Sequence, residues 1–212
     1  MAEYILHCFA QSGNAYKGAL MLQLAGADWA PRFVDFFNGE TRTPEYRRVN
    51  VMGEVPVLEH RGLTLSQSGV ILDYLAQRYP EFGGDGDEER REVLRWLFFD
   101  NHKLTSYTAT YRFLRTFVAQ PDPAVVAEFR KRAETAWNVL EAHLAHREFV
   151  AAPRLTIADI SLCGYLFWPE ELGVDWQATR PAIAGWLERI RGHPRWVAPY
   201  ALMPGHPLPG RG

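Results

Sequence analysis

A short polar segment, QSGNAYK at residues 11–17, carries two side chains that can act on a thiol. Ser12 and Asn14 follow a strand-like run and precede a helical pattern, so a hydroxyl and an amide stand where a helix begins. A donor at that place stabilises a thiolate more than a neutral thiol, and the helix dipole adds to the effect, so the pKa of a bound thiol falls. The alternative is that Ser12 and Asn14 simply cap the first helix.

Residues 51–71, VMGEVPVLEHRGLTLSQSGVI, hold two further features that can bind a ligand. Pro56 interrupts a strand-like run, and a cis bond there would turn the main-chain N–H and C=O of Val55 outward, where they can pair with an extended peptide. Gln67 and Ser68 stand where a strand ends and a helix begins, a place where free N–H groups and polar side chains can hold an amino-acid head group. The alternatives are an edge-strand proline and plain helix capping.

Aromatic and acidic side chains recur on one long helical pattern later in the chain. Tyr107 and Tyr111 lie one turn apart, and Asp100 lies two turns before Tyr107 on much the same face. The two tyrosines suit an apolar pocket for a second substrate, with Trp168 at the end of a later helix as another candidate. The alternative is packing in a core or at a domain interface.

The remaining reactive side chains favour structural roles. Cys8 lies inside the first strand-like run and Cys163 among apolar residues of a helix, so both are expected to be buried thiols rather than nucleophiles. Two cysteines cannot form a disulfide framework, and no histidine pair has metal-ligand spacing, so no metal site is expected. Thr156 and Asp159 form a capping box at the start of a buried helix.

The elements that position these residues fall into two groups. Strand-like and helical patterns alternate over the first 80 residues and end in a hairpin and a helix, which predicts a small sheet flanked by helices. Only helical patterns follow, at 87–118, 123–147, 156–168 and 180–192. We therefore expect an α/β domain at 1–80, a linker at 81–86, an all-helical domain at 87–202 and a Pro/Gly-rich surface tail at 203–212.

Composition narrows the class of protein. The 212 residues are 47% hydrophobic and carry 23 Lys and Arg against 25 Asp and Glu, so the formal net charge is −2. That balance argues against a nucleic-acid-binding surface, and no apolar run approaches the roughly 20 residues needed to span a bilayer. Because a secretory signal and a disulfide framework are both missing, we expect a cytoplasmic protein that binds neither membrane nor nucleic acid.

The ordered set of motifs resembles the cytosolic glutathione S-transferases over nearly the whole chain. It comprises QSGNAYKGALML, GEVPVLEHRGLTLSQSGVILDYL, the change to helices only, and LTIADISL. The resemblance implies a thioredoxin-like N-terminal domain with a cis-proline, an all-helical C-terminal domain, glutathione as co-substrate and a homodimer. The active-site turn looks like that of bacterial members that use Ser or Asn.

The resemblance also implies a role for each matched residue. Ser12 or Asn14 would stabilise the glutathione thiolate. Val55, which precedes Pro56, would bind the cysteinyl main chain, and Gln67 and Ser68 would bind the γ-glutamyl end. Two further roles are a grip on the glycyl carboxylate by Thr41 or Arg42 and contact with the γ-glutamyl amine across a dimer by Asp100.

Three functions stay open on these residues. The first is a detoxifying transferase that joins glutathione to a small hydrophobic electrophile, held in an acceptor pocket at Tyr107 and Tyr111. The second is a glutathione-dependent peroxidase or disulfide reductase, and the third is a non-catalytic binding protein of the same fold. The turn lacks both the cysteine of omega- or beta-like classes and the tyrosine of Tyr-type classes, since Tyr4 lies early in the strand.

Overall fold

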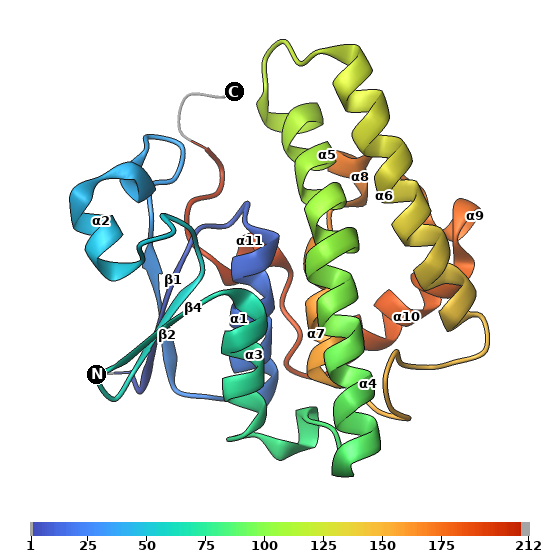
Figure 1. Cartoon of the computed structure of the whole chain (residues 1–212), viewed down its shortest axis with the longest axis horizontal. Coiled ribbons are helices and arrows are strands. Elements are labelled where there is room, and N and C mark those ends of the chain that lie inside the picture. The colour runs from blue at the N-terminus through green and yellow to red at the C-terminus, as the bar shows by residue number, and fades with distance from the viewer. Residues whose placement is uncertain (1, 209–212) are drawn as a thin grey trace. The chain divides into compact units, whose positions relative to one another are not determined.

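Four short strands near the N-terminus build one sheet in the computed structural model, which describes residues 2–208 (Figure 1). Their spatial order is β2-β1-β3-β4, with β1 parallel to β2 and the other neighbours antiparallel. Their bounds are Tyr4–Cys8 for β1, Trp29–Phe33 for β2, Val57–His60 for β3 and Leu63–Ser66 for β4. This mixed sheet confirms the predicted thioredoxin-like arrangement.

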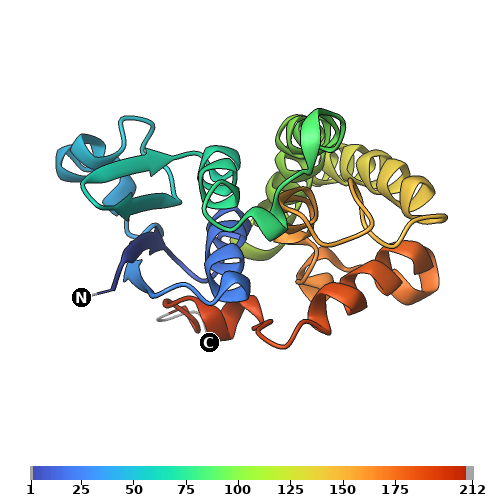
Figure 2. The same ribbon diagram turned by 90° about the horizontal axis from the view of Figure 1, so that it is seen from below.

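Helices cover both faces of the sheet (Figure 2). They are α1 at Gly13–Ala25, α2 at Pro44–Val49 and α3 at Ser68–Ala76. α1 and α3 pack against each other on one face, where Leu20 and Leu72 are fully buried. On the other face Tyr46 of α2 joins Val34 and Val57 in a small buried cluster. The carboxyl ends of β1 and β2 therefore lead into loops at one edge of a sheet that is packed on both sides.

The last part of the chain belongs to the same compact unit as the sheet. This unit comprises the chain up to Tyr79 and the segment that begins at His193, while the second unit runs from Pro80 to Gly192. The first change of unit falls between Tyr79 and Pro80. The second differs from the expected helical domain, which was drawn through to residue 202.

Main-chain and side-chain hydrogen bonds hold this last segment in place. The Tyr16 hydroxyl donates to the Val197 carbonyl at 2.9 Å, just before α11 at Pro199–Leu202. The Ala10 N–H donates to the Pro204 carbonyl at 2.7 Å. A surface tail was expected at 203–212 because a segment so rich in Pro and Gly does not form a helix. Hydrogen bonds such as those above leave no periodic pattern in the sequence, so they could not be predicted from it. Residues 209–212 of that tail lie outside the described residues.

The unit from Pro80 to Gly192 is built of helices and connecting turns. Its elements are η2 (Pro80–Phe82), α4 (Gly86–Phe99), η3 (Asp100–Leu104), α5 (Thr105–Phe117), α6 (Pro123–Leu144), α7 (Ile157–Leu162), η4 (Cys163–Tyr165), α8 (Pro169–Leu172), α9 (Trp176–Thr179) and α10 (Pro181–Arg191). Across residues 2–208, no helix is both long and apolar enough to cross a bilayer.

A π-helical turn, η3, divides the single helix expected at 87–118. Thr105 Oγ1 donates to Asp100 Oδ1 at 2.7 Å, and Ser106 Oγ donates to the Asn101 carbonyl at 2.5 Å. The main-chain N–H of Thr105 also donates to the Asp100 carbonyl, five residues earlier, which is the hydrogen-bond period of a π-helix rather than that of an α-helix. The apolar pattern that predicted one helix is little changed by a single wider turn, so the interruption was not foreseen.

The capping box predicted at Thr156 and Asp159 is confirmed. The Asp159 carboxylate is fully buried and accepts from the main-chain N–H groups of Thr156 and Val150 and from the Trp186 indole, each at 2.9 Å. Burial raises the pKa of Asp159, and these hydrogen bonds, which favour its ionised form, oppose that rise. One carboxylate thus starts α7 and ties it to α10.

Candidate functional site

Ser12 closes the turn between β1 and α1. Its Oγ accepts from the Ala15 N–H at 3.1 Å and so caps α1, while its own N–H donates to the Phe9 carbonyl at 3.0 Å. The residue is buried, with 6% of its surface exposed. Capping uses a lone pair of the hydroxyl, so the hydroxyl proton is still available to a thiolate. The capping and ligand roles of Ser12 are therefore compatible.

Asn14, in the first turn of α1, faces the start of α3. The Ser68 hydroxyl donates to Asn14 Oδ1 at 3.5 Å, a long hydrogen bond, and both residues are half-buried. The amide nitrogen of Asn14 makes no hydrogen bond to any residue between 2 and 208. The structure thus brings together two predicted site residues that are 54 positions apart, and it leaves an amide donor open there.

The N-terminus of α3 has no side-chain cap. Gln67 occupies the cap position without a side-chain hydrogen bond to the helix, and it adopts a φ of +70°. A left-handed φ at a residue other than glycine costs on the order of 1 kcal/mol or more, and such strain concentrates at functional sites. The N–H groups of Ser68, Gly69 and Val70 have no intrahelical acceptor, so they form a site suited to an anion.

The Gln67 side chain points toward the loop that precedes Pro56. Its Nε2 donates to Met52 Sδ at 2.9 Å and to Glu54 Oε2 at 3.2 Å. The amide oxygen of Gln67 is left to accept from another donor. Two carboxylate or amide oxygens, from Gln67 and Glu54, thus lie close to the open N-terminus of α3.

The loop before Pro56 is fixed through the Glu54 carbonyl. This oxygen accepts from the Tyr46 hydroxyl at 3.0 Å and from Asn50 Nδ2 at 2.9 Å. The Val55–Pro56 peptide bond is cis, as expected. No hydrogen bond joins the Val55 main chain to another residue of the described chain, 2–208. One N–H and one C=O are therefore open to a ligand.

Thr41 and Arg42 lie in the 3₁₀ turn η1, Glu40–Arg42. Thr41 is buried, and its main-chain carbonyl packs closely on Gly53. A Cβ added to Gly53 would lie 2.8 Å from the Thr41 carbonyl oxygen. Arg42 is exposed, and no ion pair joins it to the residues that the structure describes. Of the two residues expected to grip a carboxylate, Arg42 has the exposed side chain and Thr41 the buried one.

Asp100 lies inside the helical unit rather than at its surface. It is 1% exposed, and its carboxylate accepts from Thr105 Oγ1 at 2.7 Å and from Ser161 Oγ at 2.5 Å. Its oxygens are therefore used to hold η3 and α7 together. This placement corrects the expectation that Asp100 reaches the amine of a ligand, because a buried and bonded carboxylate is not accessible to one.

Tyr107 and Tyr111 have different surroundings. Tyr111 is buried, and its hydroxyl donates to the Leu172 carbonyl at 3.1 Å, which corresponds to the core-packing alternative. Tyr107 is half-buried and lines a hollow of about 290 Å³ with Phe99, Lys103, Arg132, Thr135, Ala136 and Val139. Trp168 is buried, with the Arg112 guanidinium 4.0 Å from its ring centre. Of the three aromatic residues, Tyr107 is the one with a partly exposed ring at a hollow, whereas Tyr111 and Trp168 are buried.

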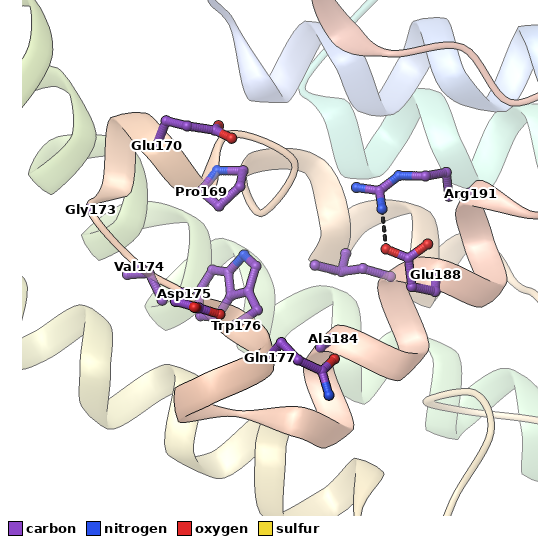
Figure 3. Close-up of a pocket in the computed structure, with 11 residues that line it drawn as sticks. Pro169, Glu170, Gly173, Val174, Asp175, Trp176, Gln177, Ala184, Glu188 and Arg191 are labelled. Carbon is purple, nitrogen blue, oxygen red and sulfur yellow. Dashed lines mark hydrogen bonds and ion pairs between the residues drawn. The ribbon is translucent and has the colours of Figure 1, made fainter.

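Another hollow, of about 540 Å³, lies among α8, α9 and α10 (Figure 3). Glu188 and Arg191 on its rim pair with each other, and Asp175 Oδ1 accepts from the Ala178 N–H at 3.0 Å as the cap of α9. The Trp176 indole donates to a main-chain carbonyl. Glu188, Arg191 and Asp175 therefore bond within the fold, and none of the predicted site residues lines this hollow.

The sequence analysis missed Tyr46, Asn50 and Glu54. Tyr46 and Asn50 position the Val55 main chain, and the Glu54 side chain meets Gln67. A signal was present, because Tyr46, Asn50 and Glu54 all lie within the ten residues that precede Pro56. No group of three metal-ligating side chains converges anywhere in residues 2–208.

Two family models match this chain. The model described as the N-terminal domain of glutathione S-transferase matches residues 3–77, and the model described as the C-terminal domain matches residues 123–189. The matched regions contain every site residue that lies in the sheet unit, and they include α6, α7 and most of α10 in the helical unit.

Known structures and proteins share the same architecture. A glutathione S-transferase from Pseudomonas fluorescens is 32% identical, covering 93% of this chain and 99% of its own, with a TM-score of 0.88. The glutathione transferase URE2P8 from Phanerochaete chrysosporium, solved with oxidized glutathione, is 21% identical over 95% of each chain with a TM-score of 0.86, a likeness of fold alone. Among curated proteins, the disulfide-bond oxidoreductase YfcG of Escherichia coli is 27% identical over 88% of this chain and 89% of its own length.

Cys8 is expected to be inert toward alkylation in the folded protein. Burial raises the pKa of Cys8 to about 12, so at about pH 8 roughly one thiol in ten thousand is ionised, and Cys163 is buried as well. Mass spectrometry after treatment with iodoacetamide should find no label on the native chain and two labels on the urea-unfolded chain. Rapid single labelling of the native chain would contradict this assignment.

Proposed function

Because this chain belongs to the glutathione S-transferase family, we propose that its N-terminal unit binds glutathione and activates the thiol for attack on a small hydrophobic electrophile. The observation that carries the proposal is the convergence of three open main-chain or amide groups. These are the Asn14 amide, the uncapped start of α3 at Ser68 and the main chain of Val55. All three belong to the N-terminal unit.

The chemistry of the tripeptide matches these groups. Its extended cysteinyl main chain can pair with the N–H and C=O of Val55 as an added strand would. Its γ-glutamyl carboxylate suits the N–H groups and hydroxyl at Ser68, and its ammonium suits the oxygens of Gln67 and Glu54. Its glycyl carboxylate suits Arg42, which is exposed and cationic.

The reaction begins with loss of the thiol proton to water. The Asn14 amide and the Ser12 hydroxyl donate to the thiolate, and the N-terminus of α1 adds a favourable field. A pKa lowered by about two units, or roughly 2.7 kcal/mol, converts a thiol that is a few per cent ionised at neutral pH into one that is mostly ionised. The sulfur lone pair then forms the bond to carbon, and the leaving group departs with its bonding electrons.

A second candidate is reduction of small disulfides with the same bound thiolate. The likeness to the Escherichia coli disulfide-bond oxidoreductase over 88% of this chain favours it. The thiolate would attack one sulfur of the disulfide, and a second glutathione would complete the exchange. Rates on an aryl chloride and on a small disulfide, measured under the same conditions, separate the two reactions.

The expected homodimer is part of the proposal, supported by apolar side chains exposed on the helical unit. Phe98 is 71% exposed, and Val139, which is 46% exposed, lines the same hollow as Tyr107. A contiguous exposed apolar patch marks a contact surface, and of the large apolar side chains exposed on this unit Phe98 is the most exposed. Light scattering should therefore give twice the chain mass of 24.2 kDa, and Phe98→Glu should lower it to one chain. A wild-type mass of one chain would contradict the dimer.

Ser68→Ala is expected to weaken glutathione binding by roughly tenfold, because it removes one hydrogen bond to a charged carboxylate. Calorimetry on the full chain measures the effect. Ser66→Ala is the matched control, since Ser66 is half-buried at the end of β4, two residues earlier, and should leave the affinity unchanged. Equal losses in both variants, or no binding by the parent chain, would contradict the proposed site.

Asn14→Ala is expected to raise the pKa of the bound thiol by about one unit and to lower turnover roughly tenfold, since it removes an open donor. Ser12→Ala is expected to do the same and also to lower the free energy of unfolding by about 1 kcal/mol, because it removes the cap of α1. Ultraviolet absorbance of the thiolate against pH, together with urea unfolding, measures both effects. Full activity and an unchanged thiol pKa in both variants would refute this chemistry.

A further inference from the structure

A chain of side-chain hydrogen bonds lies at the amino end of β1, the end of this strand opposite to the Ser12 turn. Its centre is His60, the last residue of β3. One ring nitrogen of His60, Nε2, is 3.1 Å from Glu3 Oε1, and the other, Nδ1, is 2.6 Å from the hydroxyl of Tyr74 on α3. A carboxylate, an imidazole and a phenol hydroxyl are thus connected in that order, and all three belong to the N-terminal unit.

The imidazole is held in one orientation. His60 is 5% exposed, and its neighbour across the β1–β3 ladder, Tyr4, stacks on it with ring centres 4.2 Å and planes 17° apart. The Arg61 guanidinium donates to the same Glu3 oxygen at 2.7 Å and so keeps the carboxylate beside Nε2. Hydrogen bonding with His60 lowers the pKa of Glu3, so this carboxylate is ionised at neutral pH.

An ionised carboxylate at Nε2 determines which ring nitrogen carries the proton. Because a carboxylate only accepts hydrogen bonds, Nε2 of the neutral ring is the N–H, and Nδ1 is left with a lone pair. The Tyr74 hydroxyl therefore donates to Nδ1. In this arrangement an acidic group orients a base, and the base can take the proton of a hydroxyl nucleophile.

A cation covers the ring of this tyrosine. The Arg78 guanidinium carbon is 3.5 Å from the Tyr74 ring centre, and Arg78 Nη1 donates to the Tyr74 main-chain carbonyl at 3.0 Å. When the phenol loses its proton, negative charge develops on the ring and its oxygen, and a cation at this distance stabilises that charge. Tyr74 thus has both a base for its proton and a cation for its charge.

Both ends of the hydrogen-bonded chain lie at the protein surface. The Glu3 side chain is 37% exposed and Tyr74 is half-buried, whereas His60 between them is buried. A hollow of about 370 Å³ adjoins the carboxylate end, where Glu3 and His60 line it together with the apolar Ile5 and Leu63. A small molecule can therefore approach a site whose base is itself shielded from water.

We propose that Tyr74 is a nucleophile that accepts acyl groups from activated esters, with His60 as its base and Glu3 as the residue that positions this base. The activity does not use the thiol site, so it does not depend on the proposed function. In the first step the phenol oxygen bonds to the carbonyl carbon of the ester, and His60 Nδ1 takes the phenol proton. The alkoxide or aryloxide part of the ester leaves with the bonding electrons, and the imidazolium then passes its proton to solvent.

A second step releases the acyl group from Tyr74. Neutral His60 takes a proton from water while the water oxygen bonds to the carbonyl carbon of the tyrosyl ester. The Tyr74 oxygen leaves with the bonding electrons and takes the proton back from His60, and the carboxylic acid departs. The two steps together hydrolyse one ester with one water molecule.

The probe for this site is 4-nitrophenyl acetate, added to the full chain without glutathione. One equivalent of 4-nitrophenolate per chain should be released rapidly, and mass spectrometry should find one acetyl group, on the peptide that contains Tyr74. Because a general base contributes about a hundredfold to a rate, His60→Gln should slow this acylation roughly a hundredfold. Tyr74→Phe should abolish it, since the nucleophile is lost.

Tyr79→Phe is the matched control and should leave the rate unchanged. Tyr79 is also half-buried, five residues further along the chain, but its hydroxyl bonds to Tyr4 rather than to a histidine. Glu3→Gln should slow acylation roughly tenfold, because one charge-assisted hydrogen bond is lost. It should also move the rise of the rate with pH to lower pH, since the imidazolium loses its counter-charge, and a merely structural role of Glu3 would not move this profile.

Absence of the rapid release, or an acetyl group on a residue other than Tyr74, overturns this inference. An unchanged rate in Tyr74→Phe or in His60→Gln overturns it too, as does an equal fall in Tyr79→Phe. If His60→Gln does not fold, as judged by circular dichroism, the position of the acetyl group on the parent chain and the rate of Tyr74→Phe decide. None of these outcomes bears on the proposed function, which is tested by the affinity for glutathione.

Discussion

The site depends on one carbonyl oxygen, that of Glu54. Both of its lone pairs are used, by the Tyr46 hydroxyl and by Asn50 Nδ2, and Tyr46 is itself fixed in the buried cluster beneath α2. The loop is therefore anchored to the sheet on the residue before Val55, which leaves the Val55 main chain facing away from the ladder without a partner among residues 2–208. The Glu54 carboxylate, on the same residue, accepts from Gln67 and so connects the loop to the start of α3. Removing either donor would loosen the loop and the helix start together.

Two helix N-termini meet at this corner, and they are treated differently. α1 is capped by Ser12, whereas α3 begins at a left-handed Gln67 that makes no side-chain cap. An absent cap costs about 1 kcal/mol, and the strain at Gln67 adds a similar amount. A bound carboxylate that accepts from the free N–H groups of α3 restores part of this free energy. The unfilled helix end is thus a local instability, which the γ-glutamyl carboxylate of the proposed ligand would reduce.

Much of the fold and part of the site followed from local patterns. Alternating apolar residues and helix caps predicted the sheet, the helices and the capping box, and the breaks at Pro56 and Gln67 were visible because they interrupt a pattern. The support from Tyr46 and Asn50 and the return of the last segment depend on contacts that no local pattern encodes. Asp100 shows the limit most clearly. A polar residue on a helical pattern reads as exposed, yet Asp100, at the start of the π-helical turn, is 1% exposed and two hydroxyl groups donate to its carboxylate.

The groups that the proposed function assigns to the tripeptide are of two kinds. Those at Val55 and at the start of α3 are mostly main-chain atoms, and their geometry is fixed by the fold. Those at the turn between β1 and α1 are side-chain groups, the Ser12 hydroxyl and the Asn14 amide. A substitution of either side chain leaves the main-chain groups in place, so the pKa of a thiol bound there can change while recognition of a peptide main chain is kept. Ser12 connects the two kinds of group, because its hydroxyl also caps α1 and so fixes the turn that the thiol would face.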